Sequence, residues 1–280
     1  MQIFKKRSAL KRCLSFIKEQ NKEIGFVPTM GALHNGHLSL IDASKKNNDI
    51  TVVSIFVNPT QFDNKEDLKK YPKTLEKDLT LLKTIGCDIV FIPTVEEIYD
   101  NHIDSSSFSF DGLEDQMEGK FRDGHFDGVT TVVQKFFAII SPTNSYFGEK
   151  DFQQLQIVKK LVQKNNIPVH IVGCPIFREK DGLAMSSRNA RLTKEERIAA
   201  PFIYETLKKI RKKLSKNTLN ETVLFVEDQF AKHPILSLEY ITIAEEKTLL
   251  TPKKLDAAKK HRAFIAVNAG MIRLIDNISL

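Results

Sequence analysis

The stretch Ile24-Gly-Phe-Val-Pro-Thr-Met-Gly-Ala-Leu-His-Asn-Gly-His37 decides the fold of this chain. Its apolar half, 24–29, predicts a buried strand, and the glycine-containing half leads into an apolar-periodic stretch that predicts a helix. A strand that turns directly into a helix opens a β-α-β unit, in which parallel strands are covered by helices on both faces. If the rest of the chain repeats this pattern, the fold is α/β.

The pattern repeats through the first 176 residues. Further strands are predicted at 50–57, 88–92, 144–148 and 169–176, and helical periods at 75–82, 129–140 and 155–162. Residues 101–124 are polar and lack a clear period, so we expect a long surface excursion there, of the kind that carries mobile loops.

The character of the sequence changes after Arg191. One long charged helix is predicted from Thr193 to Leu214, a second at 221–230, and strands near 238–244, 263–267 and 271–275. We therefore predict an α/β fold: a Rossmann-like parallel sheet in residues 1–176 and a smaller C-terminal α+β domain in residues 177–280, with the linker between Ile176 and Arg191.

Composition excludes several classes of protein. The 280 residues are 41% hydrophobic and 28% charged, which is typical of a globular protein, and no apolar run approaches the roughly 20 residues that cross a bilayer. The basic start, 1–12, is followed by an apolar stretch too short for a signal peptide, so we expect a cytoplasmic protein. The three cysteines lack the spacing of a disulfide framework or a zinc site.

The net charge of +7, from 42 basic and 35 acidic residues, allows two interpretations. A basic surface can attract small acidic substrates, or it can be an ordinary solvated surface. The lysines are scattered rather than gathered with aromatic residues, which gives nucleic-acid binding no support.

The most specific motif is His34-Asn-Gly-His37, at the predicted start of a helix. Free backbone N–H groups and the helix dipole favour phosphate there. Two histidines three residues apart can face one ligand from the first turn, and Gly36 lets that ligand approach the backbone. The alternative is a pair of surface histidines that cap the helix.

Other polar groups also follow predicted strands, and in an open parallel sheet the carboxyl ends of the strands meet at the ligand site. Lys150 is a flexible point charge suited to phosphate, and Arg188 is a rigid donor fork. Ser186 and Ser187 add hydroxyl donors, and Asp151 can cap its own helix or ligate Mg²⁺ through water. As alternatives, Lys150 is a solvated lysine at a helix start and the serines are a plain helix cap. The groups expected in one cleft are His34 and His37, Asn58 and Gln61, 148–151, and 186–188.

Seven motifs, in order, make the chain resemble the pantothenate synthetase (pantoate:β-alanine ligase) family of the HxGH nucleotidyltransferase superfamily. The resemblance covers residues 24–277 and rests on PTMGALHNGHLSL (Pro28–Leu40), SIFVNPTQF (Ser54–Phe62), YPKTLEKD (Tyr71–Asp78), GKFRDGHF (Gly119–Phe126), YFGEKDFQQL (Tyr146–Leu155), DGLAMSSRN (Asp181–Asn189) and RLIDN (Arg273–Asn277).

The resemblance implies an ATP-dependent condensation of pantoate with β-alanine through a pantoyl adenylate, releasing AMP and pyrophosphate and supplying a coenzyme A precursor. It implies ATP as a substrate with Mg²⁺, a homodimer, and no nucleic-acid or membrane partner. Residues 1–176 would bind nucleotide and pantoate, and residues 177–280 would close over ATP.

The resemblance also implies roles for individual residues. The catalytic residues would be His34, His37, Lys150 and Arg188, and a metal contact would come from Asp151. Pantoate and β-alanine would be bound by Asn58, Gln61 and Gln154, whose neutral amides both donate and accept. From the residues alone, Gln154 could equally be a surface residue of its helix. The ATP-binding set would be Met30, Gly31, Ala32, Leu33, His34, Asn35, Gly36, His37, Gly148, Glu149, Lys150, Asp151, Phe177, Met185, Ser186, Ser187 and Arg188.

Three questions stay open at this point. Arg122 and His125 fit the GKFRDGHF motif but could equally form a salt bridge within a loop. Another nucleotidyltransferase of the same fold would share His34 and His37, although Gln61 and Gln154 favour a small hydroxy acid as substrate. A non-catalytic nucleotide-binding regulator should have lost some of the phosphate-binding side chains, and the chain has kept them.

Overall fold

The computed structural model describes residues 1–62, 65–100 and 102–280; Asn101, at the start of the predicted excursion, lies outside the described residues. The chain forms two compact units. The first unit comprises Met1–Glu149 and Gln153–Pro175, and the second comprises Lys150–Phe152 and Ile176–Leu280. None of the helices in the described ranges is both long and apolar enough to span a bilayer.

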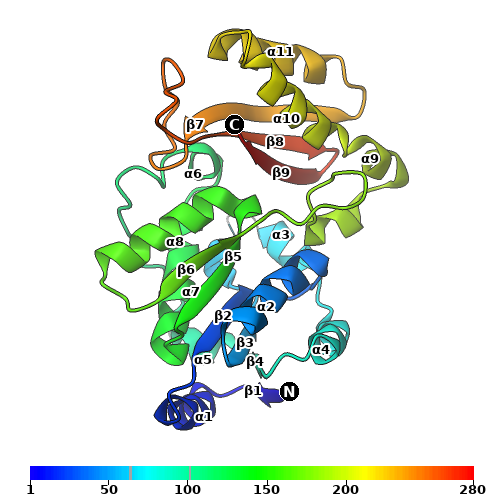
Figure 1. The fold of residues 1–280 in the computed structure, drawn as a ribbon. Helices are drawn as coiled ribbons and strands as arrows, with labels where there is room; N and C mark the ends of the chain where they lie inside the picture. Colours follow the sequence, from blue (N-terminus) through cyan, green and yellow to red (C-terminus); the bar gives the residue numbers. More distant parts are fainter. Residues whose placement is uncertain (63–64, 101) are drawn as a thin grey trace. The chain divides into compact units, whose positions relative to one another are not determined.

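The first unit is built on a six-stranded parallel sheet (Figure 1). Its spatial order is β1-β4-β3-β2-β5-β6. Strand β2 pairs in parallel with β3 on one side and with β5 on the other, so the chain order reverses at β2. This is the α/β sheet that the sequence predicts. The strands are β1 (Gln2–Phe4), β2 (Ile24–Thr29), β3 (Ile50–Ile55), β4 (Ile89–Phe91), β5 (Asn144–Gly148) and β6 (His170–Cys174).

The N-terminal strand and helix are absent from the elements predicted from sequence. Strand β1 has only three residues, which pair with β4 at the sheet edge, and α1 (Arg7–Glu19) follows it. This helix is rich in basic residues, and its buried residues are Leu10 and Leu14, so its apolar face is narrow. The strand that leads to His34 is therefore the second in the chain and not the first.

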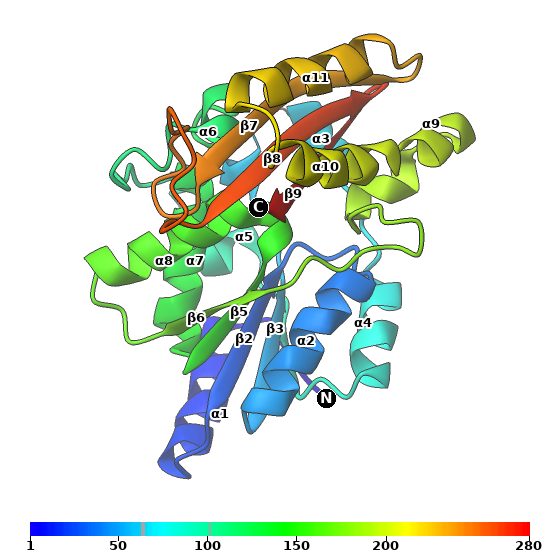
Figure 2. The same cartoon turned by 45° about the horizontal axis from the view of Figure 1, so that its top comes forward.

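Helices cover both faces of the sheet (Figure 2). Alternate residues of a strand point to opposite faces, and Val27 of β2 packs in a cluster with residues of α2 and α4. Its neighbour Phe26 meets the rings of Phe136 and Phe137 on α7 at centroid distances of 5.6 and 6.4 Å. The helical segments after α1 are α2 (Asn35–Asn47), η1 (Pro59–Gln61), α3 (Lys65–Lys70), α4 (Leu75–Thr84), α5 (Val95–Tyr99), α6 (Met117–Phe121), α7 (His125–Ile140), η2 (Glu149–Asp151) and α8 (Phe152–Lys164).

The segment 102–124 differs from the surface excursion predicted for it. Phe110 and Leu113 are almost fully buried. The side chain of Gln153, on α8, donates to the carbonyls of Leu113 and Gln116 at 2.8 and 2.7 Å and accepts from the amide of Glu118 at 3.0 Å. A segment held by side-chain to backbone bonds needs no hydrophobic period, which is why the sequence pattern hid its anchors.

The second unit contains a three-stranded antiparallel sheet of order β7-β8-β9. One side of this sheet packs with helices around a single apolar cluster that includes Ile203, Val226 and Ile265. The elements are η3 (Ser187–Arg191), α9 (Lys194–Ala199), α10 (Phe202–Lys213), α11 (Leu219–Ala231), β7 (Leu236–Glu245), β8 (His261–Ala269) and β9 (Ile272–Ser279).

The long helix predicted from Thr193 to Leu214 is two helices. The break falls at Ala200 and Pro201, between α9 and α10. Proline lacks the N–H that an uninterrupted helix would use and its ring clashes with the preceding turn, so the helix ends and restarts. The prediction of one helix was wrong because the apolar period continues across the break.

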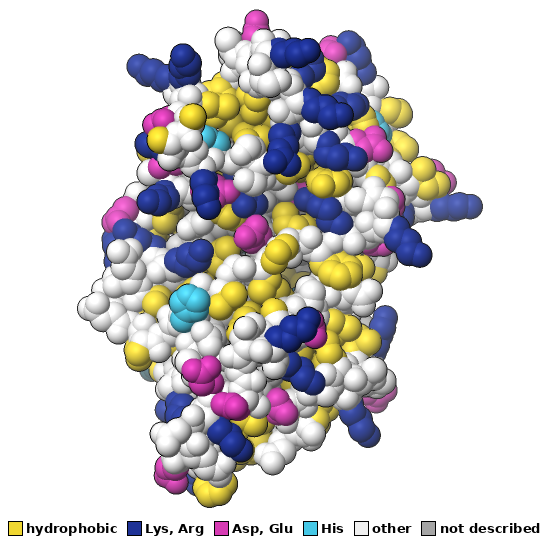
Figure 3. All heavy atoms as spheres, in the orientation of Figure 1, with side chains coloured by type: hydrophobic (Ala, Val, Ile, Leu, Met, Phe, Trp, Pro, Cys, Tyr) yellow, Lys and Arg dark blue, Asp and Glu magenta, His cyan; other side chains and the backbone are white. Residues whose placement is uncertain are grey.

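The scattered basic residues stay scattered on the folded surface. On the face shown in Figure 3, lysine and arginine side chains are spread among acidic and uncharged ones rather than gathered into one block. This distribution agrees with the scatter of lysines along the sequence.

Candidate active site

The loop between β2 and α2 has a strained backbone. Gly31 and Ala32 have φ angles of +78° and +48°, values at which glycine carries little cost and alanine is strained. A Cβ on Gly31 would also lie 3.0 Å from Oδ2 of Asp78. At the start of the loop, the Thr29 hydroxyl donates to the carbonyl of Ser54 at 2.6 Å and accepts from the Gly31 amide at 3.2 Å.

A buried carboxylate from another helix holds this loop. Asp78, on α4, is 1% exposed. Its Oδ2 accepts from the Ala32 amide at 3.0 Å, and its Oδ1 accepts from the Leu33 amide at 2.8 Å and from the Thr74 hydroxyl at 3.1 Å. Sequence reasoning missed this role of Asp78. It was missed because residue type and helical position do not distinguish Asp78 from the exposed Glu76. The one available signal was its place at the end of the motif YPKTLEKD.

His34 and His37 cap the helix α2 that follows. The amide of Gly36 donates to Nδ1 of His34 at 3.1 Å, and the amide of His34 donates to Nδ1 of His37 at 3.4 Å. The two rings lie with centroids 4.1 Å apart. A backbone N–H can only donate, so each Nδ1 is an acceptor and each neutral ring carries its proton on Nε2.

This capping corrects one expectation. The sequence predicts free N–H groups at the start of α2, whereas the Gly36 amide in that first turn donates to His34. The amides of Gly31, Ala32, Leu33 and His34, which precede the helix, also donate within the protein. Because these amides already donate within the protein, the prediction that this loop binds phosphate rests on the two imidazoles and the helix dipole. The helix-cap alternative is correct as a description of both histidines, and it fixes the orientation of their rings.

A second turn, η1, follows β3 and carries Gln61. Asn58 precedes it and is 1% exposed. Its Nδ2 donates to the carbonyl of Gly128 at 3.0 Å, and its Oδ1 accepts from the Tyr99 hydroxyl at 2.7 Å. Burial raises the pKa of Tyr99, which keeps this hydroxyl a donor. The Asn58 amide thus supports the turn, and its contact with a substrate stays a prediction.

Helix α7 approaches this turn closely. A Cβ on Gly128 would lie 2.2 Å from the carbonyl oxygen of Thr60, so only glycine fits. His125, one turn earlier on α7, contacts the carbonyl of Gln61 through Nδ1 at 2.9 Å and Arg122 through Nε2 at 3.1 Å. Arginine only donates, so Nε2 accepts and Nδ1 carries the proton toward Gln61. Arg122 also lies 3.8 Å from Glu118, so the salt-bridge alternative holds for this residue as well.

The topology brings most of the predicted residues of the first unit to one edge of its sheet. Strands β2, β3 and β5 are adjacent, and their carboxyl ends lead to the histidine pair, to Asn58 and Gln61, and to Gly148 and Glu149. Gln154 lies in the first turn of α8, just after β5. These residues are therefore neighbours in the fold although they lie far apart in the sequence.

The remaining predicted residues belong to the second unit. Lys150 and Asp151 form an ion pair with Nζ and Oδ1 3.6 Å apart, and Asp151 is about half exposed. Among the described residues, no group of three histidine, cysteine, aspartate or glutamate side chains could hold a metal ion. The contact between Asp151 and Mg²⁺ stays a prediction.

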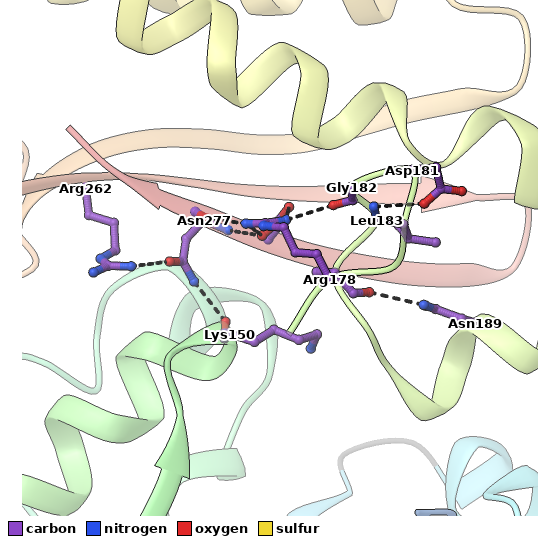
Figure 4. Close-up of polar contacts among 10 residues, drawn as sticks. Lys150, Arg178, Asp181, Gly182, Leu183, Asn189, Arg262 and Asn277 are labelled. Carbon is purple, nitrogen blue, oxygen red and sulfur yellow. Dashed lines mark hydrogen bonds and ion pairs between the residues drawn. The ribbon is translucent and has the colours of Figure 1, made fainter. Parts of the chain in front are cut away.

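The segment 177–189 forms a hairpin followed by a 3₁₀ turn (Figure 4). Arg178 and Ala184 pair across it, and the Met185 amide donates to the carbonyl of Phe177 at 3.0 Å. Ser186 caps η3, with its hydroxyl accepting from the Arg188 amide at 3.3 Å. A hydroxyl that accepts in this way can still donate its hydrogen, so the cap does not exclude phosphate binding.

The chain is similar to proteins of one family along its whole length. The family model for pantoate-beta-alanine ligase matches residues 2–279. Curated relatives named pantothenate synthetase include one from Flavobacterium psychrophilum, 57% identical with all of both chains covered, and one from Christiangramia forsetii, 52% identical with 100% and 99% covered.

Solved structures agree with the sequence relatives. Pantothenate synthetase from Thermus thermophilus superposes with a TM-score of 0.92 at 38% identity, covering 99% of each chain. Pantoate-beta-alanine ligase from Francisella tularensis, complexed with beta-gamma ATP and beta-alanine, superposes with a TM-score of 0.83 at 38% identity, covering 100% of this chain and 97% of the other.

Proposed function

Because this chain belongs to the pantoate-beta-alanine ligase family, whose enzymes form pantothenate, we propose that it condenses pantoate with β-alanine through a pantoyl adenylate. In the first step the pantoate carboxylate attacks the α-phosphate of ATP, and pyrophosphate leaves. In the second step the β-alanine amine attacks the acyl carbon, loses a proton, and releases AMP and pantothenate. No protein group needs to become covalently attached.

The observation that carries the proposal is the capped histidine pair. With Nδ1 of His34 and of His37 accepting backbone amides, both rings carry a hydrogen on Nε2. In the proposed first step, negative charge grows on the oxygens of the α-phosphate, and fixed donors aimed at such oxygens contribute on the order of 10² to 10³ in rate. We assign His37 as the donor to the phosphates and His34 as its companion.

The second unit supplies the cationic groups of the proposal. Lys150 and Arg188 bind phosphate oxygens, and Ser186 and Ser187 donate further hydrogen bonds. This assignment is supported by their motif matches and by the beta-gamma ATP with which the Francisella enzyme is complexed. The remaining loop residues named above for ATP, including Phe177 and Met185, stay part of this proposal.

Pantoate and β-alanine are assigned to the amides at the sheet edge. Gln61 and Gln154 can both donate to a carboxylate and accept from a hydroxyl. Nδ1 of His125 lies 2.9 Å from the carbonyl oxygen of Gln61. This contact fixes the backbone from which the Gln61 side chain extends. We place nucleotide and pantoate binding in residues 1–176 and closure over ATP in residues 177–280.

Magnesium is proposed to arrive with ATP. Bound to the phosphates, it neutralises charge on the triphosphate. Asp151 is the residue of this chain that would contact it, through water, while its ion pair with Lys150 holds the carboxylate. A homodimer and a cytoplasmic location are also proposals from the family resemblance, and sedimentation velocity tests the first of them.

Isotope exchange tests the proposed chemistry. With pantoate and without β-alanine, the protein should exchange labelled pyrophosphate into ATP, because the first step is reversible while the adenylate stays bound. His37→Ala should slow this exchange by about 10² or more. Exchange at the wild-type rate in His37→Ala, or no exchange in wild type while pantothenate still forms, would contradict the mechanism.

A further inference from the structure

The motif Arg273-Leu-Ile-Asp-Asn277 takes no part in the proposed reaction, yet its last residue touches the segment that carries Lys150. Asn277 lies on β9 and is 1% exposed. Its Nδ2 donates to the backbone carbonyl of Lys150 at 3.0 Å (Figure 4). The buried amide of Asn277 therefore holds the segment around Lys150, which lies far from Asn277 in the sequence.

Arg262 fixes the orientation of that amide. Its Nη1 donates to Oδ1 of Asn277 at 2.6 Å and its Nε donates to Glu246 at 2.9 Å. Its guanidinium also lies 4.0 Å from the ring centre of Phe152. Because arginine has no acceptor, Oδ1 of Asn277 must face Arg262, and Nδ2 must face Lys150. Arg262 thus holds the segment 150–152 twice, through Asn277 and through the ring.

The neighbouring residue of the strand holds the other phosphate-binding segment. Asp276 receives two hydrogen bonds from Arg178, at 2.6 and 2.9 Å. Arg178 also donates to the carbonyl of Gly182 at 3.1 Å, and its guanidinium lies 3.6 Å from the ring centre of Tyr204. Asn189, next to Arg188, donates to the carbonyl of Ala184 at 3.1 Å and so ties η3 to the same hairpin.

We propose that Asn277 is a positioning residue for Lys150, and that the pair Asp276 and Asn277 sets the spacing between Lys150 and the turn carrying Arg188. The proposal rests on the assignment of those two cations to ATP. Adjacent residues of one strand hold both cation-bearing segments within the second unit. The distance between Lys150 and Arg188 is therefore fixed before the phosphate chain of ATP binds. A misplacement of about 1 Å at such a site can cost on the order of 10² in rate.

The first test replaces the donor and keeps the shape. In Asn277→Asp an oxygen faces the Lys150 carbonyl, which removes the hydrogen bond and adds repulsion, while Arg262 keeps an acceptor. We expect kcat/KM for ATP to fall about ten- to hundredfold and the Kd of ATP, measured without pantoate, to rise. The KM for β-alanine should change by less than about twofold, because its contacts are elsewhere. Asn277→Ala should show the same pattern.

A double-mutant cycle separates positioning from general weakening of the fold. If Asn277 acts through the Lys150 ammonium, then Asn277→Asp should cost little further kcat/KM for ATP in a Lys150→Ala background. The cycle is measured on kcat/KM for ATP and not on the free energy of unfolding, because Asn277 contacts Lys150 directly and residues in contact need not have additive effects on stability.

Glu239→Gln is the matched control. It weakens the pair between Glu239 on β7 and Arg273 on β9, whose Nε lies 2.8 Å from the carboxylate, without touching the segment 150–152. It should lower stability and leave kcat/KM for ATP unchanged. The proposal is overturned if Glu239→Gln and Asn277→Asp lower kcat/KM equally, if the cycle is additive in kcat/KM, or if Lys150→Ala binds ATP normally. Wild-type protein that binds ATP but forms no pantothenate would contradict the proposed function alone.

Discussion

At the scale of single residues, the site depends on side chains that never need to touch a substrate. Asp78 holds the strained loop before His34, and His125 holds the turn that carries Gln61. Each acts on backbone groups from another element. Catalysis by positioning requires supports of this kind, because the geometry of a donor is set by whatever fixes its backbone.

Asp78→Asn probes the first of these supports. The amide keeps the size of the carboxylate but presents one NH₂ group to backbone or hydroxyl donors, which leaves a buried group without a partner. We expect a loss of about 1–3 kcal/mol in the free energy of unfolding and a fall in the rate of pyrophosphate exchange. Urea denaturation and the exchange assay measure the two effects.

Glu76→Gln is the control, because Glu76 lies in the same first turn of α4 and is exposed. It should change neither stability nor exchange measurably. Equal behaviour of the two variants would show that the contacts of Asp78 do not matter to the loop.

Sequence could indicate candidate reactive side chains because their chemistry belongs to the residue type. The histidine pair, Asn58 and Gln61 follow from spacing and from the parallel sheet, whereas the role of Gln154 follows from the family resemblance alone. The supports could not be predicted in the same way: Asp78 resembles any helix-surface carboxylate, and the use of Asn277 depends on which backbone carbonyl lies opposite. The expectation of free amides at the start of α2 was wrong for Gly36, whose amide donates to the His34 ring, because histidine is an uncommon cap residue.

At the scale of elements, the strong periods were predicted well and the irregular segments were not. Residues 102–124 contain few apolar positions and no regular spacing, so the burial of Phe110 could not be inferred. Helices α9 and α10 share one apolar period, so only Pro201 marked their separation. Strand β1 is too short to show an alternation, and it is defined by its pairing with β4.

Gln153→Ala tests how the segment 110–118 is anchored. The change removes three hydrogen bonds to backbone groups of this segment. We expect a stability loss of about 1–3 kcal/mol and faster hydrogen exchange at the Glu118 amide, measured by mass spectrometry on the corresponding peptide. Gln156→Ala, on the same helix, should leave this exchange unchanged. Protection that persists in Gln153→Ala would place the anchor elsewhere.

At the scale of the whole molecule, the reactivity of the three thiols distinguishes the folded first unit from the unfolded one. Cys87 and Cys174 are buried and Cys13 is partly exposed. Burial raises the pKa of Cys87 to about 12, and burial raises the pKa of Cys174 as well. A thiol reagent should therefore modify Cys13 in the native protein and the other two only on unfolding. Rapid native modification of all three would contradict this burial.

The raised pKa also predicts an alkaline loss of stability. Above about pH 9 the thiol of Cys87 ionises in the unfolded chain but stays protonated in the folded one up to about pH 12. The folded state then binds more protons, so stability falls as pH rises, by at most about 1.4 kcal/mol per pH unit from this group. Urea midpoints measured between about pH 8 and about pH 10 should fall more steeply in wild type than in Cys87→Ala. Parallel slopes would show that this thiol ionises equally in both states.

The three residues that leave the first unit at Lys150 and return at Gln153 have a consequence for modularity. The second unit consists of two separate pieces of chain. A fragment beginning at Ile176 would therefore contain Arg262 and Asn277 but lack the Phe152 ring and the Lys150 carbonyl that they contact. Exchanging this unit between relatives would therefore require two grafts, the tripeptide 150–152 and the tail from 176. Recombination at the single junction near residue 176 would pair β9 from one parent with Lys150 from the other. Sequence changes at 150–152 and at 276–277 should therefore occur together.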